Sequence, residues 1–520
     1  MTSETVPFKP HFGAFVLETL TLGMYGESRN AIREYIQNGF DSLRQAVADG
    51  LLTEREAGIE IRFDEGKSLA IRDNGGGLRT ENAVSVLASV GASNKDYRRN
   101  AGFRGIGRLA GIVFCDTLEF RTKATGQARR TIVTFDAKKL RDKMSPHGSY
   151  AADAAETLES CVTARVEDAP DADEHYFEVT LTGFFNPPVE CENYASLKSF
   201  VEQVSPLPYG PDFPHAGAIL EQARARNFDI EWVRIFVRNG DAPQEELFKP
   251  YGKDVGVKKE RVPLLIDYVA SPTGTWWGWV GRKRVSGTIK DPASRGVRIR
   301  VRNIQIDGTE IMRDILAVSH LGGKPRTSYA RFVDWYAGEI HIRPNAAIPN
   351  ARRDGFEEDA AWQTIRNELD EHVASTYGKL AYRTSTADQL SVDSLTKRLA
   401  EFRRTADPLI EEKRADWDVI SLAVTEANEL QRRLGLAVKA ADDSELAPIR
   451  TISDTVSGLK KELDALVVDA PRGSACEAEI ALALSEFTQM LYSALKQRLG
   501  PSEWQRAREI VRELSGEDPI

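Results

Sequence analysis

Cysteine is scarce in this sequence. The chain of 520 residues has four cysteines, which lie far apart: Cys115, Cys161, Cys191 and Cys476. No two of them form a C-x-x-C pair or another metal-ligand spacing, so the sequence offers neither a disulfide framework nor a cysteine-based metal site. We therefore expect reduced thiols and a cytoplasmic protein.

Long apolar runs and a positive charge balance are also missing. No run approaches the roughly 18 apolar residues of a membrane-spanning helix, and the initial MTSETVPFKPHFG has no apolar signal core. We expect no membrane partner. The net charge of −9 argues against general coating of nucleic acid, but it leaves room for a local basic patch.

The order of expected strands and helices divides the chain into three regions. Residues 1–215 mix strands and helices and end in SPLPYGPDFPHAG, which is dense in proline and glycine and marks a boundary. Residues 216–385 are again mixed. Residues 386–520 carry apolar residues at spacings of three and four among charges, which predicts a bundle of helices for dimerisation or partner binding.

The stretch EYIQNGFDS, residues 34–42, lies within an expected helix that ends near Gly50. Glu34, Asn38 and Asp41 follow one another at spacings of four and three, which places them on one helical face. Apolar residues surround this stripe. Alone, the stripe fits an ordinary solvated surface as well as a ligand site.

Two glycine-rich stretches follow this helix. IRDNGGGL puts Asp73, Gly75 and Gly77 directly after a strand. Glycine lets the backbone approach a flat ligand closely, although a plain hairpin turn fits too. The second stretch, NAGFRGIGRLAGI, puts a glycine loop before an expected helix, an arrangement that binds phosphate. Its spacing matches neither a Walker A loop nor a Rossmann loop.

Together and in this order, E-x-x-x-N-x-x-D, D-x-G-x-G and G-x-x-G-x-G resemble the GHKL ATPase superfamily. Its members include gyrase B, the ninety-kilodalton heat-shock chaperones, MutL and MORC proteins, and histidine kinases. GFRGIGRLAGI is especially similar to the MutL form GFRGEALASI. The resemblance covers residues 30–185 and, more weakly, extends to 355. It implies an α+β ATP-binding domain with helices layered on a mixed, mostly antiparallel sheet. An α/β transducer-like domain and an all-helical C-terminal region would follow.

The resemblance implies a role for each residue of the helical stripe. Glu34 matches the catalytic base that activates water. Asn38 matches the ligand of Mg²⁺, a cation that prefers hard oxygen donors. Asp41 matches a supporting carboxylate, which needs a partner if buried; Arg72 or Arg104 would suit.

The glycine stretches receive nucleotide-binding roles in the same way. Asp73 matches the residue that reads the adenine amino group, Gly75 and Gly77 lie in the same loop, and Thr180 would contact Asp73 and adenine through water. Residues 79–104 match the ATP lid, which is mobile until phosphate orders it. The implied phosphate contacts are Ser93, Lys95, Gly102, Phe103, Arg104, Gly105, Ile106 and Gly107.

A second region supplies one further charge in related ATPases. IPNARRDGFE, residues 348–357, resembles the chaperone loop that brings an arginine to the γ-phosphate, which points to Arg353 as a catalytic residue. An ion pair with Asp354 or Glu357 is the alternative for this arginine. Lys290 is the competing candidate, because MutL and gyrase use a lysine from a different loop.

The region 282–302 is the basic part of the chain. In VRIRVR the residues Arg298, Arg300 and Arg302 alternate with apolar residues, so in a strand they would line one face as a row of guanidinium groups. Two interpretations remain open. The row is either balanced by acidic residues elsewhere in the protein, or it lines a groove for nucleic acid.

The resemblance implies an ATP- and Mg²⁺-dependent, ATP-hydrolysing clamp, a homodimer whose N-terminal domains pair when ATP binds. We expect chaperone-like remodelling of a protein client. The alternatives are a DNA-engaging clamp of MutL or MORC type, in repair or defence against foreign DNA, and a slow ATPase that serves as a switch. A histidine kinase is disfavoured, because no histidine stands on an expected helix before the domain.

Overall fold

The computed structural model describes residues 13, 15–19, 28–89, 107–145, 153–318, 327–350, 352–412, 417–441, 443–469 and 504. The chain forms two compact units, Met1–Arg383 and Thr384–Ile520. Among the described residues, the first unit contains an eight-stranded sheet, a five-stranded sheet and a separate pair of strands, and the second unit is helical.

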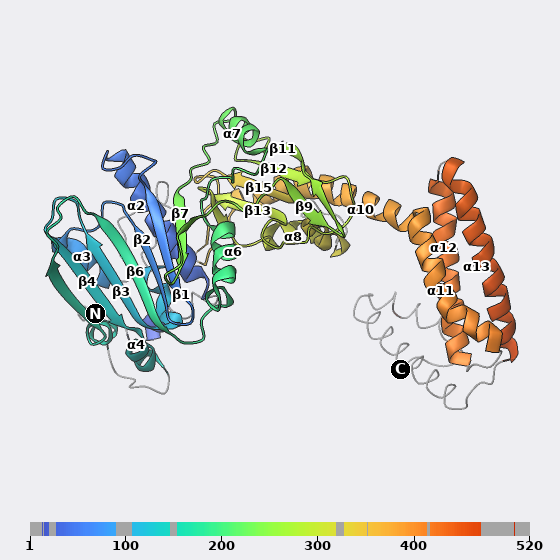
Figure 1. The fold of residues 1–520 in the computed structure, drawn as a ribbon, viewed down its shortest axis with the longest axis horizontal. Helices are drawn as coiled ribbons and strands as arrows, with labels where there is room; N and C mark the ends of the chain where they lie inside the picture. Colours follow the sequence, from blue (N-terminus) through green and yellow to red (C-terminus); the bar gives the residue numbers. More distant parts are fainter. Residues whose placement is uncertain are drawn as a thin grey trace, which may run out of the picture. The chain divides into compact units, whose positions relative to one another are not determined.

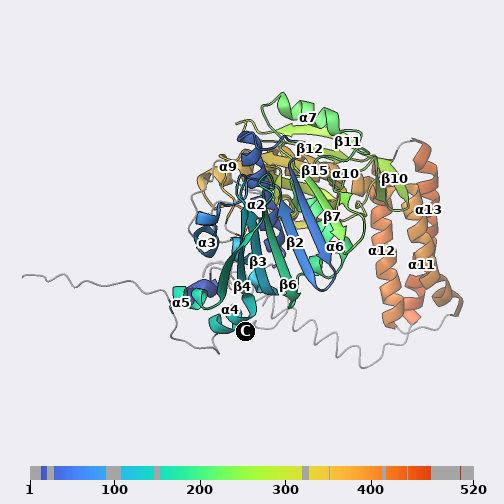
Figure 2. The ribbon, with the colours of Figure 1, turned by 60° about the vertical axis from the view of Figure 1, so that its left-hand side comes forward.

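An eight-stranded mixed sheet forms the first part of Met1–Arg383 (Figure 1). Its order is β5-β4-β3-β6-β2-β1-β7-β8, and Figure 2 shows β4, β3, β6 and β2 side by side. All neighbours are antiparallel except β1 and β7. The strands are β1 (Gly58–Asp64), β2 (Ser68–Asp73), β3 (Cys115–Lys123), β4 (Arg129–Asp136), β5 (Val162–Asp168), β6 (Tyr176–Phe184), β7 (Arg234–Asn239) and β8 (Glu245–Glu246).

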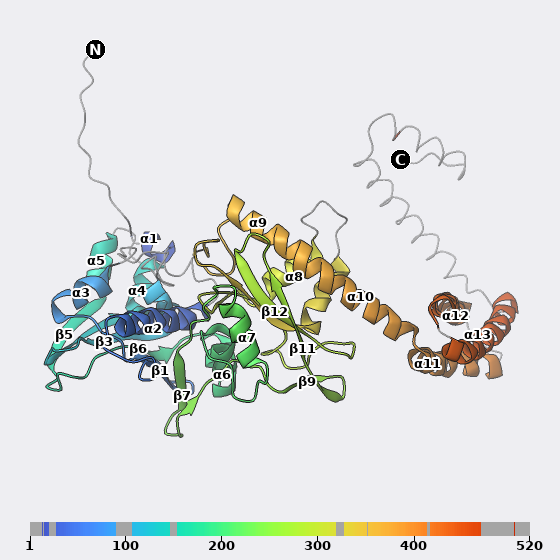
Figure 3. The same cartoon turned by 90° about the horizontal axis from the view of Figure 1, so that it is seen from above.

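Helices cover one face of this sheet (Figure 3). They are α1 (Phe15–Glu18), α2 (Asn30–Ala48), α3 (Thr80–Ala88), α4 (Ala137–Met144), α5 (Ala154–Glu159) and the 3-10 helix η2 (Gly107–Val113). The other face carries ion pairs such as Arg62–Glu178 and Arg72–Glu174. The expected architecture of helices layered on a mostly antiparallel sheet is confirmed.

The first sheet continues past the expected boundary at residue 215. The 3-10 helix η3 (Val189–Cys191) and α6 (Tyr194–Val204) lead into the proline-rich segment and α7 (Ala216–Arg224). The chain then returns, and β7 pairs in parallel with β1. The boundary itself stays a prediction.

A five-stranded sheet forms the second part of this unit, in the order β11-β12-β15-β13-β14. Both of its faces are buried, because Trp276 packs in one hydrophobic cluster while Trp277 and Trp279 pack in another. The strands are β11 (Leu265–Ala270), β12 (Trp276–Arg282), β13 (Gly296–Val301), β14 (Ile304–Ile306) and β15 (Ala337–Ile342), and β9 (Asp254–Val257) pairs separately with β10 (Glu260–Pro263). The helices are α8 (Glu310–Ala317), η4 (Thr327–Trp335), α9 (Ala360–Leu369), η5 (Asp370–Ala374) and α10 (Ser375–Leu390).

In the described part of Thr384–Ile520, three long helices pack together, as the apolar spacing predicted. They are α11 (Val392–Glu412), α12 (Trp417–Ala440) and α13 (Asp443–Asp469). Their shared core includes Leu395, Phe402, Leu434 and Val456. No helix among the described residues combines the length and apolarity needed to cross a bilayer.

Candidate functional site

Helix α2 lies close against β1 and β2, and a glycine makes this approach feasible. A Cβ added to Gly39 would come within 3.1 Å of Ile59 Cδ1 and 3.4 Å of Asp73 Cβ. Glycine costs helix stability relative to alanine, so the spacing between helix and sheet explains its place here. The polar stripe of α2 is correspondingly enclosed: Glu34 and Asp41 are buried and Asn38 is half-buried.

The carboxylate of Asp73, at the end of β2, is held against α2. Its Oδ1 accepts hydrogen bonds from the Ser42 hydroxyl and from the Gly75 backbone N–H, both at 2.9 Å. Asp73 is only 3% exposed. Two donors on one oxygen restrain the orientation of the carboxylate, which would suit the adenine-reading role that the resemblance implies for Asp73. Ser42 was not among the predicted site residues, although it ends the stretch EYIQNGFDS.

The first glycine loop is shaped by contacts with the protein itself. A Cβ on Gly75 would lie 2.1 Å from Ser42 Oγ. Gly77 has φ +63°, and its Cβ would lie 2.0 Å from the Lys123 carbonyl oxygen. Both positions therefore require glycine before any ligand is considered.

His175 adds a contact to this loop that the sequence did not indicate. Its Nδ1 lies 2.9 Å from the Gly75 carbonyl oxygen. The residue immediately precedes β6, the neighbour of β2. Its ring therefore stands beside the Asp73 loop, where Thr180 was expected to contribute.

The prediction for Thr180 is wrong. Thr180 pairs with Ala70, whereas Phe177 is the residue of β6 opposite Asp73. Side chains alternate between the two faces of a sheet. Ala70 is three residues before Asp73, so Thr180 points away from the face that carries Asp73 and α2.

Of the three glycines in the G-x-x-G-x-G motif, the last one, Gly107, lies among the described residues. Gly107 begins η2, and a Cβ on it would lie 2.3 Å from Glu34 Oε2. Tyr35 fastens η2 to α2, because its hydroxyl donates to the Arg108 carbonyl (3.1 Å) and accepts from the Gly111 N–H (2.8 Å). The remaining predicted phosphate contacts lie outside the described residues: Ser93, Lys95, Gly102, Phe103, Arg104, Gly105 and Ile106.

Arg353 contacts Glu34 directly. The Arg353 Nε lies 3.0 Å from Glu34 Oε1, and the exposed fractions of the two residues are 6% and 8%. Arg353 has φ +56°, a left-handed conformation that is rare for arginine. The structure thus brings the expected base and the expected arginine together from positions 319 residues apart.

Arg33 holds the loop that carries Arg353. Its guanidinium donates to the carbonyl oxygens of Arg352 (2.9 Å) and Arg353 (3.3 Å). Burial, only partly offset by the neighbouring Glu34 charge, lowers the pKa of Arg33 to about 10. The competing Lys290 is exposed, and its backbone N–H donates to the Gly256 carbonyl of β9.

Asp41 does not take Arg72 as its partner. Arg72 points to the other face of the sheet, where it pairs with Glu174 at 2.9 Å and lies over the Tyr176 ring. Burial raises the pKa of Glu231, and the charge of the nearby Asp41 adds to that shift. The two carboxylates therefore lie close enough for their charges to interact. The other expected partner, Arg104, lies outside the described residues.

The donor set suits magnesium held mainly by a nucleotide. Asn38 stands one turn from Glu34 on α2, which gives an amide oxygen beside a carboxylate. The part of the chain that is described has no group of three or more His, Cys, Asp or Glu side chains able to hold a metal. A Mg²⁺ ion at Asn38 would take its other ligands from phosphate and water, as this cation commonly does.

The expected row of exposed arginines is wrong for Arg298 and Arg300. They are 2% and 0% exposed, because β13 lies between β14 and β15 in a sheet that is covered on both faces. Arg298 donates to the Gln305 side chain, and the side chain of Arg302 is 10% exposed and pairs with Glu231. These arginines do not form a surface for nucleic acid.

A comparison with protein families matches residues 26–164 to the model for histidine kinase-, DNA gyrase B- and HSP90-like ATPases. This region is a GHKL-type ATPase domain. The match runs from just before α2 into β5, and so includes Glu34, Asn38, Asp73 and both glycine loops of the GHKL domain. Arg353 lies outside it. The search of curated proteins finds no match.

Proposed function

We propose that the protein is a Mg²⁺-dependent ATPase whose active site is completed by Arg353. The contact that carries the proposal is the ion pair between Arg353 and Glu34. A guanidinium buried beside the candidate base stands where negative charge develops during phosphoryl transfer to water. The GHKL-type match supports the nucleotide chemistry of the same site.

Three residues of the GHKL domain have distinct tasks in this proposal. Asp73, fixed by Ser42 and Gly75, receives the adenine amino group. Magnesium held at Asn38 would neutralise phosphate charge. Glu34 orients the attacking water and takes its proton.

The ion pair also defines the resting state of the proposed cycle. While Arg353 contacts Glu34 Oε1, this oxygen of the carboxylate is engaged by a cation. A bound γ-phosphate offers the guanidinium a more highly charged partner. We propose that Arg353 then turns from Glu34 to the phosphate, so that ATP itself releases the base.

A chaperone-like clamp that remodels a protein client is the use best supported by the position of Arg353. The DNA-engaging alternative of MutL or MORC type is supported by the similarity of GFRGIGRLAGI to the MutL loop. The other support for this alternative was the expected row of exposed arginines, and it is lost because Arg298 and Arg300 are buried. DNA binding by the wild-type protein that weakens steeply between about 50 and 200 mM salt would favour this alternative. Its absence at low salt would remove it.

The proposed clamp is a homodimer whose GHKL domains pair when ATP is bound. Sedimentation velocity with and without a non-hydrolysable ATP analogue measures this directly. A compaction or association that requires the analogue supports the clamp, whereas an unchanged sedimentation coefficient and unchanged mass contradict it.

Calorimetric titration with ATP, followed by phosphate release with and without Mg²⁺, tests the ATPase itself. The wild type should bind ATP and release phosphate only with Mg²⁺, and Asp73→Asn should abolish binding. Failure of the wild type to bind ATP, or unchanged hydrolysis in Asp73→Asn, would refute the proposal.

A further inference from the structure

The hairpin of β13 and β14 has a tight two-residue turn that contains no glycine. Val301 pairs with Ile304, so Arg302 and Asn303 alone form the turn. Both are left-handed, with φ +52° and +60°. This conformation costs free energy in most residues other than glycine, and more in Arg302 than in Asn303, so contacts with other segments help to hold the turn.

Asn303 ties the turn to three other segments. Its Nδ2 donates to the carbonyl oxygens of Glu231 (2.8 Å) and Leu207 (3.4 Å), and its Oδ1 accepts from Lys249 Nζ (2.6 Å). The residue is 2% exposed. Glu231 also pairs with Arg44 at 2.5 Å, so the turn lies near α2, the helix that carries Glu34 and Asn38.

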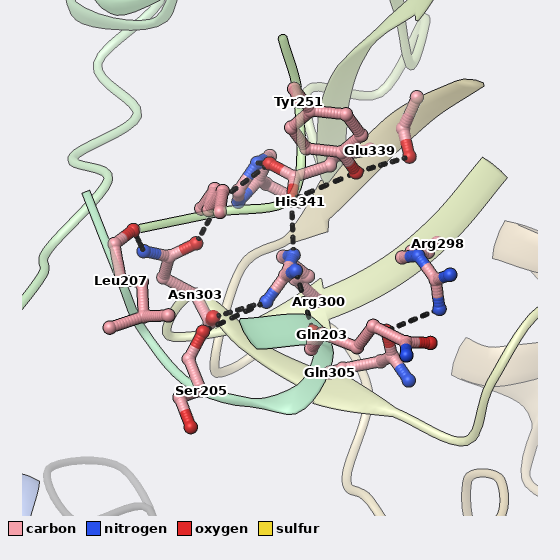
Figure 4. A network of polar contacts seen from close by, with 12 residues as sticks. Gln203, Ser205, Leu207, Tyr251, Arg298, Arg300, Asn303, Gln305, Glu339 and His341 are labelled. Atoms are coloured by element: carbon pink, nitrogen blue, oxygen red, sulfur yellow. Dashed lines mark hydrogen bonds and ion pairs between the residues drawn. The ribbon is translucent and has the colours of Figure 1, made fainter. Parts of the chain in front are cut away.

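A fully buried carboxylate on the neighbouring strand β15 also anchors the hairpin (Figure 4). Glu339 of β15 forms ion pairs with Lys249 (2.6 Å) and with Arg300 of β13 (2.5 Å). Burial opposes ionisation of Glu339, but the two cations hold its pKa well below the usual value. Arg300 also donates to the carbonyl oxygens of Gln203 and Ser205, at the end of α6.

The far end of the hairpin holds the loop of the proposed catalytic arginine. After β14, the backbone N–H of Asp307 donates to the Arg353 carbonyl oxygen at 2.9 Å. Asp307 is also left-handed, with φ +54°. The short strand Ile304–Ile306 therefore joins Asn303 at one end to the Arg353 loop at the other.

We infer that Glu339 and Asn303 are positioning residues for Arg353. Glu339 holds Lys249 and Arg300 through ion pairs. Lys249 then holds the turn through Asn303, and Arg300 holds β13. The paired strand β14 in turn positions the Arg353 loop relative to α2. The inference rests on the proposed role of Arg353 in ATP hydrolysis. It assigns a function to buried charges that lie outside the GHKL-type match.

Asn303→Gly is the sharpest test, because glycine adopts the left-handed turn without strain while the three side-chain hydrogen bonds are lost. The matched control is Asn227→Gly, an exposed left-handed asparagine in another turn. We expect kcat for ATP hydrolysis to fall about 2- to 30-fold in Asn303→Gly, with the Kd for ATP unchanged. Asn227→Gly should retain the wild-type kcat.

A double-mutant cycle separates positioning from general destabilisation. In an Arg353→Ala background, Asn303→Gly should change kcat by less than about twofold, since the residue it positions is gone. An equal loss in both backgrounds would overturn the inference. So would a wild-type kcat in Asn303→Gly.

Hydrogen exchange at the Asp307 amide tests the link from Asn303 through β14 to the Arg353 loop, and it requires no measurement of ATPase activity. Asn303→Gly should speed this exchange and Asn227→Gly should not; unchanged exchange in Asn303→Gly would refute the inference. An inactive wild type with the expected exchange pattern would instead refute the proposed ATPase function and leave the positioning of the loop supported.

Discussion

The guanidinium of Arg353 and the carboxylate of Glu34 form a buried ion pair at 3.0 Å, although 319 residues separate them in the chain. Removing one member of a buried pair leaves the other charge uncompensated, which is costly. In our proposal, the pair keeps both buried charges compensated before nucleotide binds, and it places a cation where phosphate would arrive.

Arg353→Ala should lower kcat by about a hundredfold or more, because it removes the charge that stabilises the transferring phosphoryl group. Arg352→Ala is the matched control, since Arg352 is exposed and its carbonyl, which Arg33 contacts, is retained. Steady-state phosphate release measures both variants. Equal rates for the two would remove Arg353 from the active site.

Ser42→Ala should weaken ATP binding about fivefold, since it deletes one of the two hydrogen bonds that orient Asp73. Titration calorimetry gives the Kd. Ser457→Ala, which loses an exposed hydrogen bond with Gln431 in the helical unit, should bind ATP like the wild type. A normal Kd for Ser42→Ala would show that Gly75 alone suffices to hold Asp73.

Gly107→Ala should reduce kcat about a hundredfold with little change in Tm. The new methyl would lie 2.3 Å from Glu34 Oε2, so the end of a flexible side chain must move rather than the backbone. A misplaced base loses much of its catalytic advantage. Gly217→Ala, with no atom within 4 Å of the added Cβ, should keep both kcat and Tm or raise Tm slightly.

The stability of the first unit should fall as pH drops from about 6.5 to about 4. Burial lowers the pKa of His341 to about 4. In this window the unfolded chain takes up a proton on His341 and the folded chain does not, so protonation favours unfolding by up to about 3 kcal/mol. Urea denaturation of the wild type and of His341→Phe, which keeps a ring beside Trp277, measures the difference.

The pH profile of His341→Phe should be less steep than that of the wild type across that window. His215→Phe, at a half-buried ring beside Phe213, is the matched control and should keep the wild-type profile. Parallel profiles for the wild type and His341→Phe would contradict the assignment to His341.

Local patterns sufficed for part of the site. The helical period alone places Glu34, Asn38 and Asp41 on one face, and the strand before DNGGG places Asp73 at a strand end. Both depend on neighbours within a few residues, so one sequence is enough to predict them. The short turns that join β1 to β2 and β3 to β4 depend on neighbouring residues in the same way.

Register and burial needed the three-dimensional structure. The face occupied by Thr180 depends on which residue of β2 it pairs with, and a shift of one position reverses that face. Alternation in VRIRVR predicts a half-buried strand, but a second layer covers the other face and buries Arg300. Ser42 and His175 act on Asp73 and Gly75 only through tertiary contacts.

Single-turnover hydrolysis of γ-labelled ATP by the wild type and by Glu34→Ala, with ATP binding measured on the same samples, tests the central claim most directly. We predict that the wild type releases inorganic phosphate without forming a stable phosphoprotein, and that Glu34→Ala binds ATP but leaves it intact. Wild-type phosphate release by Glu34→Ala would contradict the assignment of Glu34 as the base.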